Sequence, residues 1–254
     1  MIATLPLDVM RFELGRSLTI GRIAMWFLLV AFPVALIATL RSVEPIDPIE
    51  PWGITLYFLV PEVVCLLGLL LWATPAISTE LEGQTWIYLA MRRSGRSMVL
   101  LGKYLTAVVW TLSAAITAIT LSVLIIGPAA GFQMWWVMCV LAVLSCFAHA
   151  ALYILIGVIF YKRTMVSAVF YTLAIEYGVS FVPALINKFT INYRLRGLLA
   201  QWMGWEEARS RAENVFGAEP AETHLLVLFA FTITLLAVAI YKVTRTEYPT
   251  QQED

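Results

Sequence analysis

Charged residues are scarce in this 254-residue sequence: Asp, Glu, Lys and Arg together make up 13%, whereas hydrophobic residues make up 61%. A soluble domain usually has about 25% charged and about 45–50% apolar residues. The seventeen basic and seventeen acidic residues cancel, which excludes the basic excess that a dedicated nucleic-acid surface needs. The sequence therefore predicts an integral membrane protein in a lipid bilayer, with no nucleic-acid partner.

Cysteine is scarce as well, with only three residues. Cys65, Cys139 and Cys146 all lie inside apolar runs, without a CxxC partner or a histidine at ligand spacing. Such cysteines usually behave as small buried hydrophobic residues. We expect no disulfide framework and no metal site.

Six segments are long and apolar enough to cross a membrane, which takes about 20 residues each. The stretch from Tyr104 to Tyr161 has no charged residue and is too long for one crossing, but the turn-forming residues 127–131 divide it. The predicted fold class is an all-α integral membrane protein with a single domain over residues 1–254. Its predicted spans are about 21–40, 54–77, 98–126, 134–160, 165–187 and 223–243.

The distribution of Lys and Arg predicts the orientation of these spans. With the N-terminus inside, eleven basic residues flank the cytoplasmic ends and six the outer ends. Both termini are therefore predicted to be cytoplasmic, in a bacterial-type plasma (inner) membrane. Apolar residues at helical spacing over residues 5–20 also predict an amphipathic helix in the inner interface, the alternative being an ordinary cytoplasmic tail.

A short cytoplasmic helix is predicted over about 79–93, between the second and third spans. Thr79 with Glu82 three positions later has the spacing of a capping box, and Glu80 and Glu82 suit the positive end of the helix dipole. The helix also bears apolar residues such as Trp86. Headgroups or a cytosolic protein would have to cover it.

The long outer loop, residues 188–222, is apolar in its first half and contains Trp202 and Trp205. This composition indicates either a re-entrant segment that dips into the outer interface or an amphipathic helix on its surface.

Three ionisable residues lie within predicted spans, namely Glu62, His149 and Glu176. Ionisable groups in hydrocarbon are costly and usually face the interior of a bundle. Three hypotheses remain open: the carboxylates line a substrate path, they pair with His149 or with Ser and Thr of neighbouring helices, or they are protonated in a packed interface. Pro61, next to Glu62, should loosen its helix.

Residues 78–104 resemble the corresponding segment of the ABC-2 type permease family. The likeness rests on the pattern Glu80-x-Glu82-x-x-Thr85, on the turn Arg93-Ser94-Gly95-Arg96, and on Leu101-Gly102-Lys103-Tyr104 at the entry to a span. Gln84 stands where this family commonly has glycine, and Ser94 where proline is frequent. The six spans, the N-terminal helix and the long outer loop extend the resemblance along the chain.

The resemblance implies that residues 79–93 form a coupling helix that docks on a separate ATP-binding subunit. The residues in contact would be Glu80, Glu82, Thr85, Trp86 and Arg93. ATP and Mg would bind to that partner, so this chain would be no enzyme. A homodimer, or a heterodimer with a related permease, would form an exporter, and residues 188–222 would include short re-entrant helices.

The chain itself has no nucleotide-binding motif. Gly102-Lys103 lacks both the earlier glycine and the following Ser or Thr of a P-loop. Catalytic patterns such as HExxH and GxSxG are also missing. The alternative to an ATP-driven permease is a proton-coupled secondary transporter that uses Glu176 and His149.

Overall fold

The structure is a computed structural model that describes residues 6–44, 46–83, 95–179, 185–208, 213, 217–246 and 248. Its regular elements are all helical, and the described residues contain no strand, so the predicted all-α class is confirmed. The elements are α1 Pro6–Ser17, α2 Ile20–Val43, α3 Glu50–Tyr57, η1 Phe58–Val64, α4 Cys65–Trp72, η2 Thr74–Ala76, α5 Ser78–Glu82, α7 Gly95–Ile126, η3 Pro128–Ala130, α8 Gly131–Ile159, α9 Thr164–Tyr171, η4 Thr172–Gly178, η6 Leu185–Phe189, α10 Ile191–Met203, η7 Glu206–Ala208 and α12 Ala221–Arg245.

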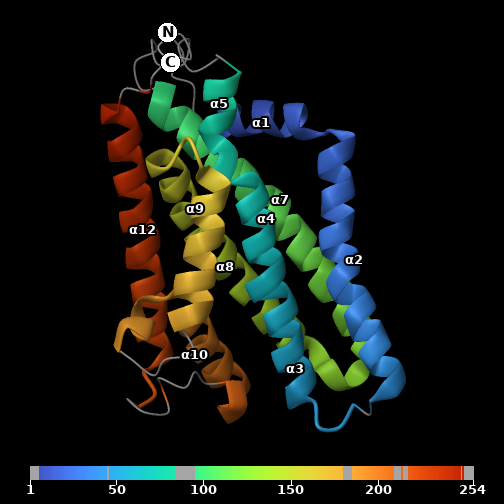
Figure 1. Cartoon of the computed structure of the whole chain (residues 1–254). Coiled ribbons are helices and arrows are strands. Elements are labelled where there is room, and N and C mark those ends of the chain that lie inside the picture. Colours follow the sequence, from blue (N-terminus) through green and yellow to red (C-terminus); the bar gives the residue numbers. More distant parts are fainter. Residues whose placement is uncertain are drawn as a thin grey trace.

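The long helices form a bundle with one short helix at each end (Figure 1). Helix α1 lies across the end where α12 finishes, and α10 lies at the opposite end, packed against α8 and α12. We call these the α1 end and the α10 end. Nine of the thirteen residues of α10 are buried, so this helix is inserted into the bundle rather than lying on its surface.

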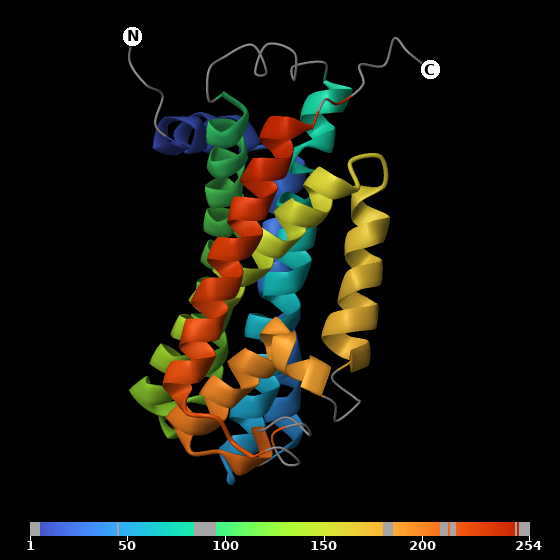
Figure 2. The ribbon, with the colours of Figure 1, turned by 90° about the vertical axis from the view of Figure 1, so that its left-hand side faces the viewer.

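Five helices are long and apolar enough to cross a membrane: Ile20–Val43, Glu50–Glu82, Gly95–Ile126, Pro128–Ile159 and Ala221–Arg245. The chain is therefore a multi-pass membrane protein by the length and composition of its helices. The predicted span 165–187 is not among the five, because its described helix ends at Gly178. Helices α9 and η4 have 8 and 7 residues. Even joined end to end, they are shorter than the helix of about 20 residues that a straight crossing needs. Figure 2 shows them as one rod along the flank of the bundle.

The second span, Glu50–Glu82, includes α5 as its last part, and Gly83 is the C-cap of α5. The predicted capping box is wrong. Thr79 lies inside this helical stretch, and its hydroxyl donates to the Pro75 carbonyl at 2.8 Å instead of accepting from the backbone of Glu82. The reason is that the helical stretch begins much earlier, at Glu50, so Thr79 is not at a helix start. From residue 84 onward, the predicted helix 79–93 lies outside the described residues.

The core is packed through small residues, and the three cysteines are buried and free, as predicted. A close approach to backbone occurs at Gly157 of α8, where an added Cβ would lie 2.4 Å from the Thr74 carbonyl oxygen. Because the obstacle is backbone, it has no rotamer with which to move aside.

The substitution Gly157→Ala should therefore destabilise the protein by about 1–3 kcal/mol through overpacking, measured as thermal unfolding in mild detergent. Gly15→Ala is the matched control: it lies in α1 with nothing within 4 Å of the added Cβ. It should be neutral or stabilising by about 0.5–1 kcal/mol, because alanine favours helix. Equal effects of the two substitutions would contradict the close packing of α8 against η2.

The predicted orientation is open to a labelling test. Ala218→Cys and Gly83→Cys place exposed thiols at the α10 end and the α1 end, and the three native cysteines are buried. An impermeant thiol reagent added to intact cells should label the first variant and reach the second only after the membrane is permeabilised. Labelling in the reverse order would overturn the orientation.

Candidate functional site

A buried ion pair holds three elements together at the α1 end. Lys103 of α7 places its Nζ atom 2.6 Å from Glu80 Oε1 of α5 and 3.9 Å from Glu13 Oε1 of α1. The three side chains are 8–15% exposed, so water screens their charges less than those of a surface pair. Lys103 thus couples the start of the predicted coupling segment to a spanning helix and to the N-terminal helix.

The predicted partner-binding residues divide into three groups. Glu80 is buried and faces Lys103, whereas Glu82 is exposed. Thr85, Trp86 and Arg93 lie outside the described residues. Of the two predicted carboxylates, Glu82 is therefore the one that the structure presents to a molecule outside the chain.

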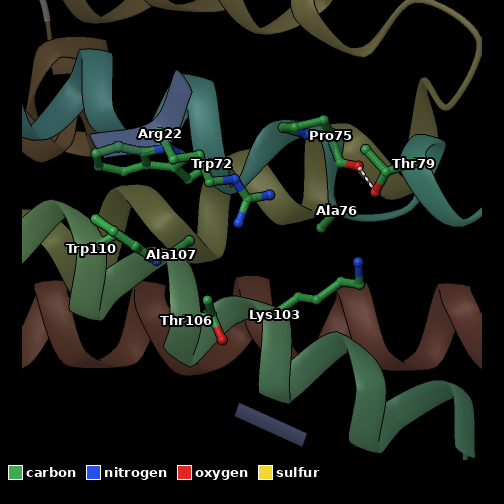
Figure 3. A pocket seen from close by; sticks show the side chains of 9 residues that line it. All are labelled: Arg22, Trp72, Pro75, Ala76, Thr79, Lys103, Thr106, Ala107 and Trp110. Atoms are coloured by element: carbon green, nitrogen blue, oxygen red, sulfur yellow. Dashed lines mark hydrogen bonds between the residues drawn. The ribbon is translucent and has the colours of Figure 1, made fainter. Parts of the chain in front are cut away.

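The small cavity of Figure 3 lies beside this ion pair and has a volume of about 30 Å³. The charged ends of Arg22 and Lys103 point toward the space between α2, α4 and α7, and Trp72 and Trp110 cover one side. This volume suits one or two water molecules rather than an organic ligand. The cavity is therefore too small to serve as a site for an organic substrate.

Arg96 ties the start of α7 to the C-terminal end of α12. One of its guanidinium nitrogens donates to the carbonyl oxygens of Thr244 and Thr246, both at 3.3 Å. A basic side chain at the last carbonyls of a helix is favourable both as a cap and toward the helix dipole. The sequence motif contained Arg96, but nothing in it indicated this distant partner.

A π-helical segment, η1, surrounds Pro61 and confirms that this proline loosens the second span. Ser145 of α8 donates to the Pro61 carbonyl at 2.6 Å. His149 stands one turn further along α8, with its Nδ1 atom 3.1 Å from Ser145 Oγ and 3.0 Å from the Ser145 carbonyl oxygen. His149 Nε2 is buried and has no hydrogen-bond partner among the described residues.

Glu62, on the same π-helical segment, is 1% exposed. Its Oε1 atom lies 2.5 Å from the guanidinium of Arg196 on α10. Sequence reasoning missed this partner, since the outer loop offers five basic residues and no local spacing selects one of them. Only the insertion of α10 into the bundle brings Arg196 to Glu62.

Glu176, on η4, meets the other part of α10. Its carboxylate accepts from the backbone N–H groups of Ile191 at 3.4 Å and Asn192 at 3.2 Å, while Thr190 caps the same helix by accepting from Tyr193 N. A carboxylate at a helix N-terminus satisfies backbone donors that would otherwise be left without partners. No hydrogen bond or ion pair joins Glu176 to His149 in the described part of the chain.

A third cluster fixes the segment that follows α10. Glu219 accepts from Lys188 at 2.7 Å and from Arg194. Burial alone would raise the pKa of Glu219, but the hydrogen bonds and positive charges of Lys188 and Arg194 outweigh it and hold this pKa below its usual range. Arg194 also lies 3.5 Å from His224 on α12, so the cluster closes the α10 end.

Comparison with known proteins does not identify the chain: no protein-family model matches it, and no curated protein matches it. The class that the fold defines is a helical multi-pass membrane protein. The charged clusters around Lys103, Glu62 and Glu219 are the features of the structure that bear on a narrower function.

The pairing of Glu62 and Arg196 predicts a clear mutational pattern. Arg196→Gln leaves a buried carboxylate without its cation and should cost about 3 kcal/mol, measured as thermal unfolding in detergent. The double variant Glu62→Gln/Arg196→Gln should recover at least half of that loss, because the charge is removed as well. Arg41→Gln, at an exposed position of α2, is the control and should change stability by less than about 0.5 kcal/mol. Additive losses in the double variant would contradict the pairing.

Proposed function

We propose that the chain is the transmembrane subunit of an ATP-driven exporter of the ABC-2 type. The observation that carries the proposal is the Lys103 cluster, which links the family-like segment after Ser78 to both α7 and α1. A force applied to that segment would reach two helices through one buried contact. The exposed carboxylate of Glu82 would meet basic groups of an ATP-binding partner.

In this proposal the partner subunit holds ATP and Mg, and its closure moves the coupling segment as a rigid body. Spans two and three follow, because α5 is continuous with the second span and Lys103 belongs to the third. At the opposite end α10 is anchored to the second span by Glu62 and to the fifth predicted span by Glu176. Displacement of these helices would release α10 and open the outer side.

The proposal includes six spans, with residues 165–187 as the fifth. The support is the outward face of α9 and η4, where Val166, Phe170 and Leu173 are 63–72% exposed. Apolar side chains exposed in this way suit contact with lipid. A homodimer or a heterodimer of such subunits, with both termini cytoplasmic, would form the complete permease.

Helix α1 would lie in the inner membrane interface. Its apolar Leu7 and Phe12 are 52% and 67% exposed, beside the exposed basic residues Arg11 and Arg16. Apolar and basic side chains on one outward surface are typical of helices that bind anionic lipid headgroups. Proton-coupled transport through Glu176 and His149 is less favoured, since Glu176 is engaged by the N-terminus of α10.

The proposal predicts a stoichiometric ATPase partner. The tagged chain, expressed with its native neighbours and purified in mild detergent, should carry a second protein of soluble type with ATPase activity. Glu82→Lys should reduce the amount of this partner at least threefold, because it places a positive charge opposite basic groups, while thermal stability stays unchanged. Glu222→Lys, an exposed carboxylate at the α10 end, is the matched control and should retain the partner.

Two results would count against the proposal in different ways. If the chain purifies without any ATPase, the hypothesis of ATP-driven transport is wrong. Full partner recovery with Glu82→Lys would reject only the role given to Glu82.

A further inference from the structure

A cavity with charged side chains in its wall lies at the α10 end, between α3, η1, α10 and η7. Its volume is about 400 Å³, within the range of pockets that hold small organic ligands. Glu62 and Arg196 contribute the buried ion pair, Glu207 and Tyr57 add polar groups, and Ile54 and Leu199 are among the apolar side chains of the wall.

Two buried polar atoms of this wall have no partner in the described part of the chain. They are the Glu62 Oε2 atom and the Tyr57 hydroxyl, on side chains of residues that are 1% and 2% exposed. A buried polar group without a hydrogen bond costs about 1–3 kcal/mol. A built cavity that retains two such atoms is a candidate for a ligand that would satisfy them.

The charges of the wall indicate which charge that ligand would carry. Glu62 and Glu207 are two carboxylates against the single guanidinium of Arg196, which already binds Glu62 Oε1. The unpartnered Oε2 atom is an acceptor only, and the Tyr57 oxygen can accept as well. The wall therefore favours a cationic hydrogen-bond donor, and its apolar residues favour a carbon skeleton attached to that donor.

We propose that this cavity is a binding site for a primary ammonium group carried on a small apolar body. The ammonium group would donate to Glu62 Oε2 and to the Tyr57 hydroxyl, and the apolar body would pack between Ile54 and Leu199. The donor is either a free amphipathic amine or the ethanolamine headgroup of a lipid. The site does not depend on an ATP-binding partner, so its test is independent of the proposed transport function.

The test measures binding of radiolabelled benzylamine to the purified full-length chain by equilibrium dialysis at pH 7.5, where the amine carries a proton. Unlabelled benzylamine should displace the label at least tenfold more effectively than benzyl alcohol or benzoate, which match its shape but lack the ammonium group. Displacement by the three compounds within twofold of one another would overturn the proposal, and so would preferential displacement by benzoate.

Variants of the wall locate the bound amine. Glu62→Gln should weaken binding at least tenfold, and Tyr57→Phe, which removes only a hydroxyl, about three- to tenfold. Thr55→Trp adds bulk at a partly exposed position of the wall and should also abolish binding if Glu62→Gln fails to fold. Glu222→Gln removes a carboxylate elsewhere at the same end and should bind normally. Unchanged binding by a folded Thr55→Trp variant would overturn the site.

A last arm distinguishes the two sources of the ammonium group. Short-chain phosphatidylethanolamine should displace the label if the ligand is a lipid headgroup, whereas phosphatidylcholine, whose quaternary ammonium lacks N–H donors, should not. Displacement by benzylamine alone supports a free amine. Equal displacement by both lipids would contradict recognition by hydrogen bonds from an ammonium group.

Discussion

Two carboxylates carried by the apolar helices, Glu62 and Glu176, both find their partners on the short helix α10. In a bilayer interior such groups have no water to satisfy them, so their partners have to come from the chain itself. Arg196 supplies a cation to one carboxylate, and the N-terminal N–H groups of α10 supply hydrogen bonds to the other. The position of α10, and with it the shape of the charged cavity, follows from this requirement.

At the opposite end of the bundle the charge that needs partners is positive, and the partners are carboxylates. Lys103 is a largely buried cation, and it contacts Glu80 and Glu13 from two other elements. The same contacts that satisfy Lys103 join α1, α5 and α7. The stability of this end and the proposed coupling would therefore share one physical cause, while Glu82 is exposed.

Between the two ends, a side-chain hydrogen bond and a small residue join the second and fourth predicted spans. The π-helical turn at Pro61 is satisfied by Ser145 from α8, and the small residue Gly157 lets α8 approach Thr74. These contacts hold the second and fourth predicted spans in register.

The sequence by itself determined the membrane class, the helical content and five of the predicted spans, because each depends on local hydropathy over about 20 residues. It also indicated the loosening at Pro61 and the burial of the cysteines and of Glu62, His149 and Glu176. It misplaced a helix cap at Thr79, since the helical stretch of the second span runs from Glu50 through that position to Glu82. The tertiary structure alone decided which partner each buried charge has: Arg196 is 134 residues from Glu62, and pairing over such a separation is set by helix packing, which no local spacing in the chain records.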